Sequence, residues 1–370
     1  MRASALLANI AVVALLSQPA AARNLWVFGD SNVDTGWFMV APYSGNTNFD
    51  FDLAMSSTYD IGKPTNNPGP MSVETLGRLF STAAAPANQG GTNYATSGAK
   101  NVNANTPLNG GFPNAVPTVT QIANFIQGNP GLGSIAGDIF VIDSGANDIG
   151  FALGALSGFT SAQQTAYLQD QAMALANATK NLQLDGATHI IVVGQPESFG
   201  NAQFQAARQF YDTTLRNALD AAQVSYAWAD ANQVRKDIVA NPATFNILYT
   251  TTAAGQVACA PPNPALNITT AWALLCSAQS PVSQPTSFAD QALFADDQHW
   301  AARAQEALGS YLFCLAVATW PQLTPPPPPR GLPPPRTRLP FACSDFSEFT
   351  QPKVFLPVVE VSPVLAIEAK

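Results

Sequence analysis

Short apolar runs alternate with long Ala- and Gln-rich stretches between residues 24 and 320, and this alternation constrains the fold more than any other feature of the sequence. The runs with the length and composition of buried strands are Leu25–Phe28, Ile139–Ile142, His189–Val193 and Val224–Trp228. The longer stretches with apolar residues at helical spacing are Gln163–Leu184, Ala202–Ala222 and Ala301–Ala318. Strands that alternate with helices form βαβ units, which put a parallel sheet between two helical layers. The sequence therefore predicts an α/β fold with a mainly parallel sheet.

The segment from Gly36 to Asn129 departs from this alternation. It is rich in Asn, Gly, Thr, Ser and Pro and has few periodic runs. We expect it to form long loops laid over the sheet, where binding surfaces are usually found.

The N-terminus has the features of a secretory signal. Arg2 precedes an apolar run from Ala5 to Leu16, and small residues at 20–22 offer a cleavage site after Ala22. The alternative is an uncleaved anchor, but the apolar run is shorter than the roughly 18 residues that a membrane span needs, and no later segment reaches that length. We therefore expect a signal peptide at residues 1–22, export to an extracellular or periplasmic location, and no transmembrane span.

Prolines crowd the stretch from Pro321 to Pro340, which predicts stiff polyproline II. The predicted organisation is then a globular domain at 23–320, a Pro-rich linker at 321–340 and a short apolar tail at 341–370. The tail either docks on the domain or stays flexible. We favour a solvated, dispensable tail over a spacer that leads to a wall or membrane element.

The chain has 4 cysteines, and export would make disulfides possible. Cys259 with Cys276 is the preferred pair, because that bridge closes a Pro-rich insertion whose own core is thin. Cys314 lies in an apolar helical stretch, so a buried free thiol and a bridge to Cys343 remain equal alternatives.

Charge excludes several classes of partner. The chain carries 16 Lys or Arg against 24 Asp or Glu, a net charge of −8. Binding of nucleic acid depends on Lys and Arg residues that displace counterions from the phosphates. Because this chain has few of them, we expect no nucleic-acid partner. Attachment to a membrane through basic residues is excluded on the same ground. The sequence does not indicate an oligomeric state.

The clearest local motif is Phe-Gly-Asp-Ser at residues 28–31, which ends the first predicted strand. The tip of a central parallel strand is where doubly wound folds bind ligands. Residues 32–36 could open a helix whose first N–H groups face charge that develops near Ser31. A helix N-cap is the commoner role for such a serine when the motif stands alone.

A serine nucleophile needs a base, and the chain has only 2 histidines. His189 begins a predicted strand after Asp185, where a structural role is expected. His299 is the better candidate, because Asp296 precedes it by three residues and could hold one ring nitrogen while the other faces Ser31. A metal site would need more His or Cys ligands than this chain supplies, so we expect no metal.

Two further segments suit an oxyanion hole. Residues 93–98 end in Gly98, where backbone could approach a reacting centre closely. Residues 145–148 follow the second predicted strand and place Asn147 at its tip, where a side-chain amide could donate to an oxyanion. A loop glycine and an Asx turn are the ordinary alternatives.

The order of these motifs along residues 24–320 resembles the SGNH hydrolases, also called the GDSL lipase/esterase family. The longer loops are similar to those of bacterial secreted and autotransporter-passenger GDSL esterases. The resemblance implies a flavodoxin-like three-layer α/β/α sandwich and no cofactor. It also implies Ser31 as nucleophile and oxyanion donor, His299 as base, Asp296 as its orienting carboxylate, and Gly98 and Asn147 as further oxyanion donors.

The sequence departs from the family pattern at three places. Asn32 follows the serine where Leu is common, Trp300 follows the histidine where Pro is common, and Ala99-Lys100 is an unfamiliar continuation of Gly98. We expect the first and last to alter the acyl pocket and Trp300 to reshape the entrance beside the base. None of them removes a catalytic atom.

The resemblance implies a secreted serine ester hydrolase that acts on a small-molecule or lipid ester through an acyl-serine intermediate. The alternatives are a phospholipase or lipid acyltransferase of the same family, a polysaccharide acetylesterase and, from a different class, a non-catalytic binding module. The sequence does not indicate acyl chain length or the natural alcohol.

Overall fold

The computed structural model describes residues 24–66, 68–104, 112–129, 137–154, 157–196, 202–253, 255–259, 273–277, 286–324 and 340–350. The predicted signal peptide lies outside the described residues, as do most of the predicted linker and residues 351–370 of the predicted tail.

A parallel sheet of four strands forms the centre of the molecule, and the strands lie side by side in chain order. They are β1 (Leu25–Gly29), β2 (Ile139–Asp143), β3 (His189–Gly194) and β4 (Ala227–Asp230). The strand predicted to begin at Val224 begins later, because Val224 N–H still donates to the carbonyl of Leu219 as the chain leaves the preceding helix. The parallel sheet and its βαβ order are as predicted.

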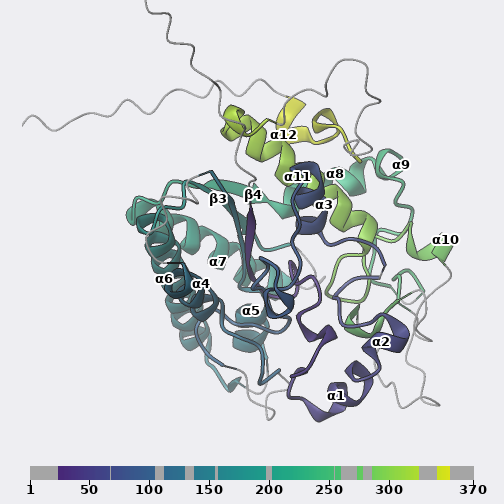
Figure 1. The fold of residues 1–370 in the computed structure, drawn as a ribbon, viewed down its shortest axis with the longest axis horizontal. Helices are drawn as coiled ribbons and strands as arrows, with labels where there is room; N and C mark the ends of the chain where they lie inside the picture. Colours follow the sequence, from purple (N-terminus) through teal and green to yellow (C-terminus); the bar gives the residue numbers. More distant parts are fainter. Residues whose placement is uncertain are drawn as a thin grey trace, which may run out of the picture.

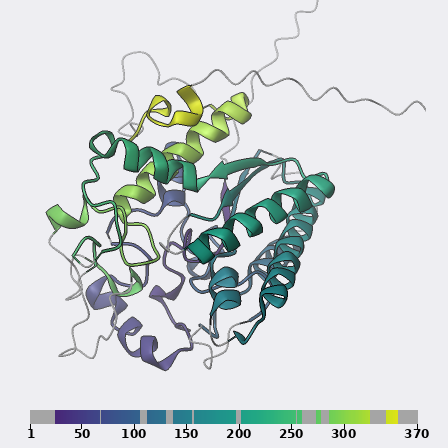
Figure 2. The ribbon, with the colours of Figure 1, turned by 180° about the vertical axis from the view of Figure 1, so that it is seen from behind.

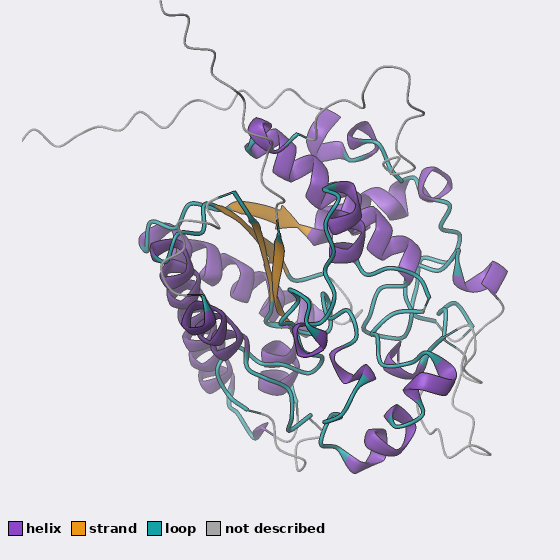
Figure 3. Ribbon diagram, in the orientation of Figure 1, coloured by secondary structure: helices purple, strands orange, loops and turns teal. Residues whose placement is uncertain are grey.

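Alternate strand residues face two separate cores, which gives the sandwich its three layers. Leu25 and Val27 pack into one core, whereas Phe28 packs into the other. One helical layer consists of α4 (Thr118–Gly128), α6 (Ser161–Leu184) and α7 (Ala202–Ala221), and the opposite layer of α3 (Ser72–Leu79), α8 (Ala231–Ala240) and α11 (Ala302–Thr319). Figures 1 and 3 show the strands between these two layers. The predicted three-layer α/β/α sandwich is confirmed.

The remaining short elements lie in the connections. They are α1 (Thr47–Leu53), α2 (Ser56–Tyr59), α5 (Ala146–Leu153), α9 (Pro242–Phe245), α10 (Thr286–Ala289), α12 (Ser347–Thr350) and the 3₁₀ turns η1 (Trp37–Met39), η2 (Ala87–Gln89), η6 (Ala273–Leu275), η7 (Pro321–Leu323) and η8 (Cys343–Asp345).

An extended segment runs beside β1 on the side away from β2. Val27 N–H donates to Thr92 O, Tyr94 N–H donates to Val27 O, and Thr96 N–H donates to Gly29 O. This segment occupies the outer sheet position without forming a full strand. It delivers the chain to Gly98 at the same end of the sheet as Ser31.

The segment from Gly36 to Asn129 is more helical than its sequence predicts. It contains α4, which packs against β1, and α3, which packs against α11. In α4 the buried side chains include the polar Gln121 together with Ile122 and Phe125. The apolar stripe is therefore too short to be conspicuous, and the expectation of loops alone was wrong here.

Two disulfides join the described cysteines. Cys259 bonds to Cys276, as predicted, and Cys314 bonds to Cys343, which decides the alternative that the sequence left open.

The second bridge holds residues 340–350 against α11. Phe341 and Phe346 are 3% and 0% exposed in the core beneath them. Tyr311 of α11 donates to the Glu348 carboxylate. The yellow segment beside α11 in Figures 1 and 2 is this part of the chain. Residues 340–350 therefore dock on the domain, and the expectation of a solvated tail was wrong for them.

Within the described ranges, no helix has both the length and the apolar character needed to cross a membrane.

Candidate active site

Ser31 lies in a tight turn at the carboxyl end of β1. Asp30 N–H donates to Asp143 O at 3.1 Å, which carries the pairing with β2 one residue past the strand. Val33 and Asp34 then donate their N–H groups to Asp30 O. The chain makes one turn here and does not continue into a helix, so the helix expected at residues 32–36 is absent. The turn places Ser31 at the tip of the strand.

The structure brings Ser31, His299 and Asp296 together from opposite ends of the chain. Ser31 Oγ lies 2.9 Å from His299 Nε2. His299 Nδ1 lies 2.8 Å from Asp296 Oδ2 and 3.0 Å from Oδ1. All three residues are nearly inaccessible to solvent. A hydroxyl, an imidazole and a carboxylate in this order can take a proton from the hydroxyl and stabilise the imidazolium that results.

The short loop before α11 positions the imidazole. Ala295 N–H donates to His299 O at 2.7 Å, which closes the loop. Asp296 Oδ1 accepts from the N–H groups of Gln298 at 2.8 Å and His299 at 2.6 Å. Asp296 Oδ2 accepts from Ala273 N–H at 2.8 Å, in the segment closed by the first disulfide. Backbone donors therefore hold the Asp296 carboxylate in position independently of its contact with the imidazole ring.

The pKa values of the two groups move in opposite directions. Burial tends to lower the pKa of His299, but Asp296, together with Asp30 and Asp297, outweighs it, so the pKa is raised above 6.5. Burial tends to raise the pKa of Asp296, but His299 and the backbone donors outweigh it, so that pKa lies below 3.8. Near neutral pH the carboxylate is ionised, and the imidazole keeps its proton to a higher pH than a free imidazole does.

Gly98 lies at the same end of the sheet, in a conformation that suits glycine. Its φ is +80°, and a Cβ at this position would lie 2.8 Å from the Phe112 ring. A larger residue would have to displace the ring or change the backbone, so the loop keeps its path only with glycine.

Asn147 lies in the first turn of α5, where it contacts the Gly98 loop. Its Nδ2 donates to Ala99 O at 3.0 Å. The next residue, Asp148, accepts from Asn101 N–H at 2.9 Å and from the Tyr167 hydroxyl at 2.9 Å. The start of α5 therefore holds the 98–101 loop in place through two adjacent side chains. Gly98 and Asn147 therefore lie at the same loop.

Asp34 joins the same loop to the serine turn, and no motif in the sequence indicates this contact. Its carboxylate accepts from Gly36 and Trp37 N–H on one oxygen and from Ser97 N–H and Oγ on the other, at 2.6–2.8 Å. Burial raises its pKa despite these donors. Only the three-dimensional fold brings residues 34 and 97 together.

A buried polar network lies behind the serine turn, and sequence reasoning missed it as well. Asp143 Oδ1 accepts from Gln195 Nε2 at 3.0 Å and from Asn32 Nδ2 at 3.4 Å. Gln195 N–H in turn donates to Asp212, which pairs with Arg208 at 2.9 Å. Asn32 therefore points at the tips of β2 and β3, which explains why a polar residue stands where Leu was expected.

The other two departures are also buried. Trp300 is 2% exposed and packs in the core beside α11, so it does not border an entrance and that expectation was wrong. The ammonium of Lys100 lies 4.3 Å from the centre of the Phe151 ring, one helical turn after Asn147. Burial lowers the pKa of Lys100, although Asp148 acts in the opposite direction.

The second histidine lies at the far end of the sheet. His189 Nδ1 is 3.2 Å from Asp138 O, Nε2 is 3.2 Å from Gln322 Nε2, and the ring packs edge-on against Trp320. This is the structural role that was expected.

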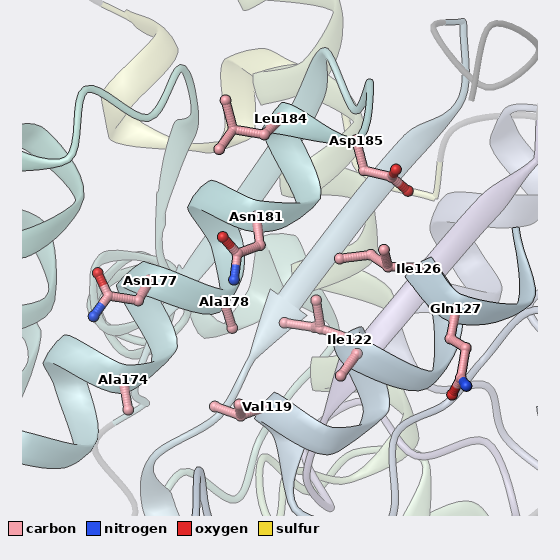
Figure 4. Close-up of a pocket in the computed structure, with 11 residues that line it drawn as sticks. Val119, Ile122, Ile126, Gln127, Ala174, Asn177, Ala178, Asn181, Leu184 and Asp185 are labelled. Atoms are coloured by element: carbon pink, nitrogen blue, oxygen red, sulfur yellow. The ribbon is translucent and has the colours of Figure 1, made fainter. Parts of the chain in front are cut away.

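Asp185, the acid four residues before His189, is not hydrogen-bonded to it within the described part of the chain. Asp185 borders an apolar groove of about 720 Å³ between α4 and α6, and Ile122 and Ala178 line the floor of this groove (Figure 4). In the described residues no group of three His, Cys, Asp or Glu side chains could hold a metal ion.

Comparisons with known proteins give one family match and several structural neighbours. The model of the GDSL-like lipase/acylhydrolase family matches residues 25–312. The sequence matches no curated protein. The acetylxylan esterase Axe2 of Geobacillus stearothermophilus is similar to this chain with 14% identity and a TM-score of 0.33, over 59% of this chain and 80% of that one. A substituted variant of Axe2 gives 15% identity and a TM-score of 0.34 over the same shares.

Proposed function

The chain belongs to the GDSL-like lipase/acylhydrolase family and is a carboxylic ester hydrolase, and we propose that it acts through an acyl-enzyme on Ser31. The observation that carries this proposal is the 2.9 Å contact between Ser31 Oγ and the ring of His299, whose other nitrogen lies 2.8 Å from Asp296. In such an arrangement the histidine is the general base and the carboxylate is the residue that orients it.

The reaction has two stages. Neutral His299 takes the Ser31 proton on Nε2 as Oγ attacks the ester carbonyl carbon, and the carbonyl oxygen becomes an oxyanion. The carbon–oxygen bond to the alcohol then breaks, and His299 returns the proton to the leaving alkoxide. Water repeats the sequence on the acyl-serine, which releases the acid and restores Ser31. General base catalysis of this kind contributes about 10²–10⁴ to the rate.

The oxyanion is bound by the N–H groups of Ser31 and Gly98 and by the Asn147 amide. Within the described residues the Ser31 N–H makes no hydrogen bond with another backbone group. Asn147 uses one amide hydrogen on Ala99 O, and within the described residues the second has no acceptor and can be donated to the oxyanion. Each donor of this kind is worth about 10²–10³ in kcat.

Hydrolysis of p-nitrophenyl acetate by purified variants tests this assignment. Ser31→Ala should fall to the uncatalysed background, and His299→Ala should lose about 10²–10⁴ in kcat. His189→Gln is the matched control, because it alters the other histidine at the far end of the sheet, and it should retain wild-type turnover. Undiminished activity of either active-site variant, or an equally deep loss in the control, contradicts the assignment.

We also propose that the enzyme is exported. The two disulfides support this, because such bonds persist in oxidising compartments. N-terminal sequencing of the protein recovered outside the cytoplasm should begin at Arg23. A mature chain that retains residues 1–22 contradicts the predicted cleavage.

The class of substrate follows from a profile across acyl donors. The profile compares p-nitrophenyl esters of increasing chain length, an acetylated polysaccharide and a phospholipid, each with and without an added alcohol acceptor. We propose an uncharged carboxylic ester and water as the acyl acceptor. Release of acetate only from the polysaccharide would instead identify a polysaccharide acetylesterase, and transfer to the added alcohol would identify an acyltransferase.

A further inference from the structure

The loop that carries the base and its carboxylate has two arms. Residues 293–296 form one arm, which ends at Asp296, and residues 299–302 form the other, which begins at His299. The two arms pair with each other as an antiparallel bridge. The contacts between the carboxylate and the imidazole form within this loop. The distance from the imidazole to Ser31 depends instead on what holds the loop from outside.

Backbone donors hold the Asp296 arm from outside. Ala295 O accepts from Cys259 N–H at 2.9 Å, and the Asp296 carboxylate accepts from Ala273 N–H at 2.8 Å. Both donors belong to the segment that the first disulfide closes. The Asp296 arm is therefore attached to a covalently closed part of the chain.

Two consecutive side chains from much earlier in the sequence hold the His299 arm. The Thr65 hydroxyl donates to Trp300 O at 3.1 Å, and Asn66 Oδ1 accepts from Ala302 N–H at 2.6 Å. Both side chains are buried. The two bonds therefore hold the backbone one and three residues after the imidazole.

Asn66 also supplies an acceptor that α11 does not provide for itself. The N-cap residue of α11 is Ala301, whose side chain makes no capping hydrogen bond. The first N–H groups of a helix need acceptors, and asparagine is among the residues that supply them best. Ala302 is the first residue of α11, and its N–H is the one that Asn66 accepts. Asn66 therefore fixes the start of α11 and, three residues earlier, the backbone of His299.

A second bond of the same kind joins α11 to α3 without reaching the His299 arm. Gln305 Oε1 accepts from the N–H of Ser72, the first residue of α3, at 3.0 Å. Gln305 is buried, as Asn66 is. In both bonds a buried amide oxygen accepts the first N–H of a helix, so the Gln305 bond offers a matched control for the Asn66 bond.

We propose that Asn66, together with Thr65, positions the catalytic base by holding the His299 arm so that Nε2 stays 2.9 Å from Ser31 Oγ. The inference rests on the function proposed above. Asn66 is a positioning residue, because it acts through the backbone of the His299 arm and not on the ester. A displacement of about 1 Å at a reacting group can lower the rate by about 10²-fold.

Steady-state hydrolysis of p-nitrophenyl acetate tests this role. Asn66→Ala removes the acceptor, and kcat should fall about 10- to 100-fold with KM unchanged. Asn66→Asp keeps an oxygen that can accept the Ala302 N–H, so it should return kcat to within a few-fold of the wild type. Gln305→Ala should retain wild-type kcat even where urea unfolding shows that it destabilises the protein as much as Asn66→Ala does. Unchanged kcat in Asn66→Ala, an equal loss in Gln305→Ala, or no recovery in Asn66→Asp overturns the proposal.

A second variant covers the case in which Asn66→Ala does not fold. Thr65→Val removes the donor to Trp300 O at nearly constant side-chain volume. We expect kcat to fall several-fold, with KM unchanged, because the His299 arm loses one of its two outside bonds. Wild-type kcat in Thr65→Val overturns the proposal.

Imidazole NMR separates this proposal from the proposed function. The chain has 2 histidines, so His189→Gln identifies the resonances of His299. These resonances should shift in Asn66→Ala and stay in place in Gln305→Ala, whether or not the protein hydrolyses the ester. That result with no esterase activity in the wild type would reject the proposed function and leave the positioning role standing. His299 resonances that do not move in Asn66→Ala would reject the positioning role.

Discussion

Asp296→Asn is the substitution whose effect follows most directly from the site geometry. The two Asp296 oxygens accept from four donors: one oxygen takes the Gln298 and His299 N–H groups, and the other takes the Ala273 N–H and His299 Nδ1. An asparagine offers one oxygen and one NH₂ group, so the NH₂ must face one of these two pairs.

The two orientations differ in what they leave unsatisfied. With the amide oxygen toward Gln298 and His299, only the Ala273 N–H loses its acceptor. With the oxygen toward Ala273, two buried backbone donors face the NH₂ group. One additional unpaired buried donor costs about 1–3 kcal/mol, so the first orientation is favoured by on the order of tenfold to a hundredfold.

That favoured orientation inverts the role of the histidine. The NH₂ group then donates to His299 Nδ1, the ring proton moves to Nε2, and the atom that should accept the Ser31 proton already carries one. Together with the lost carboxylate charge, we expect kcat to fall by about 10³. Binding of ester should change little, because no group that faces the substrate is altered.

The assay is steady-state hydrolysis of p-nitrophenyl acetate at pH 7, with circular dichroism to establish that the variant is folded. Asp297→Asn is the matched control, because it makes the same change one residue away at an exposed carboxylate that accepts no hydrogen bond from the ring within the described residues. We expect the control to stay within a few-fold of the wild type. Retention of more than a tenth of wild-type kcat by folded Asp296→Asn refutes the tautomer argument.

Three further predictions follow from burial and charge. Because the pKa of His299 lies above 6.5 and the base must be neutral, kcat/KM should fall as pH drops through an apparent pKa above 6.5, and a lower midpoint would contradict the raised value. Burial raises the pKa of Asp148 and of Asp212 to about 7 in the folded protein. The folded state therefore binds more protons than the unfolded state between pH 4 and 7. As the pH rises through this range, the free energy of unfolding should decrease by up to about 1.4 kcal/mol per pH unit for each group. Urea unfolding at pH 5 and pH 7 measures this change, and greater stability at pH 7 would reject the prediction. Cys343→Ala opens a bridge between residues 29 apart, and urea unfolding should show a loss of about 3–4 kcal/mol, whereas a loss below 1 kcal/mol would mean that Phe341 and Phe346 hold the segment without it.

The parts of the fold that the sequence predicted are those with a local signal. A buried strand such as β3 is an uninterrupted apolar run, and α6 and α7 are long enough to repeat their apolar spacing many times. The α4 helix was missed because part of its buried face is polar. The Gln121 side chain accepts from Gly29 N–H at 2.8 Å and donates to Gly29 O at 2.9 Å. It therefore makes the backbone hydrogen bonds that a neighbouring strand would make, and it does not act as an apolar core residue.

The residues of the candidate site also divide into those with a local sequence signal and those without one. Ser31, His299 and Asp296 were predictable because only two histidines were available and one of them followed an acid by three residues. Asp143 and Asp34 were not, because each is defined by partners from segments that only the fold brings to it. Docking of residues 340–350 was equally hidden, since Phe341 and Phe346 find their core on α11 and no periodic pattern marks so short a segment.

The acids around the site also explain how long loops stay ordered in a chain with few cations. The 16 Lys and Arg residues cannot pair with all 24 acids. The buried aspartates beside Ser31 instead accept from backbone N–H and side-chain amide or hydroxyl groups, as Asp34 does from Gly36 and Ser97. Hydrogen bonds from neutral donors to a carboxylate are short and strong, and they need no second buried charge. Loops rich in Asn, Gly, Ser and Thr supply such donors in abundance. The same composition that weakens regular helices in residues 36–129 therefore provides the donors that the buried carboxylates require, and Asp34 uses them to join two loop segments beside the nucleophile.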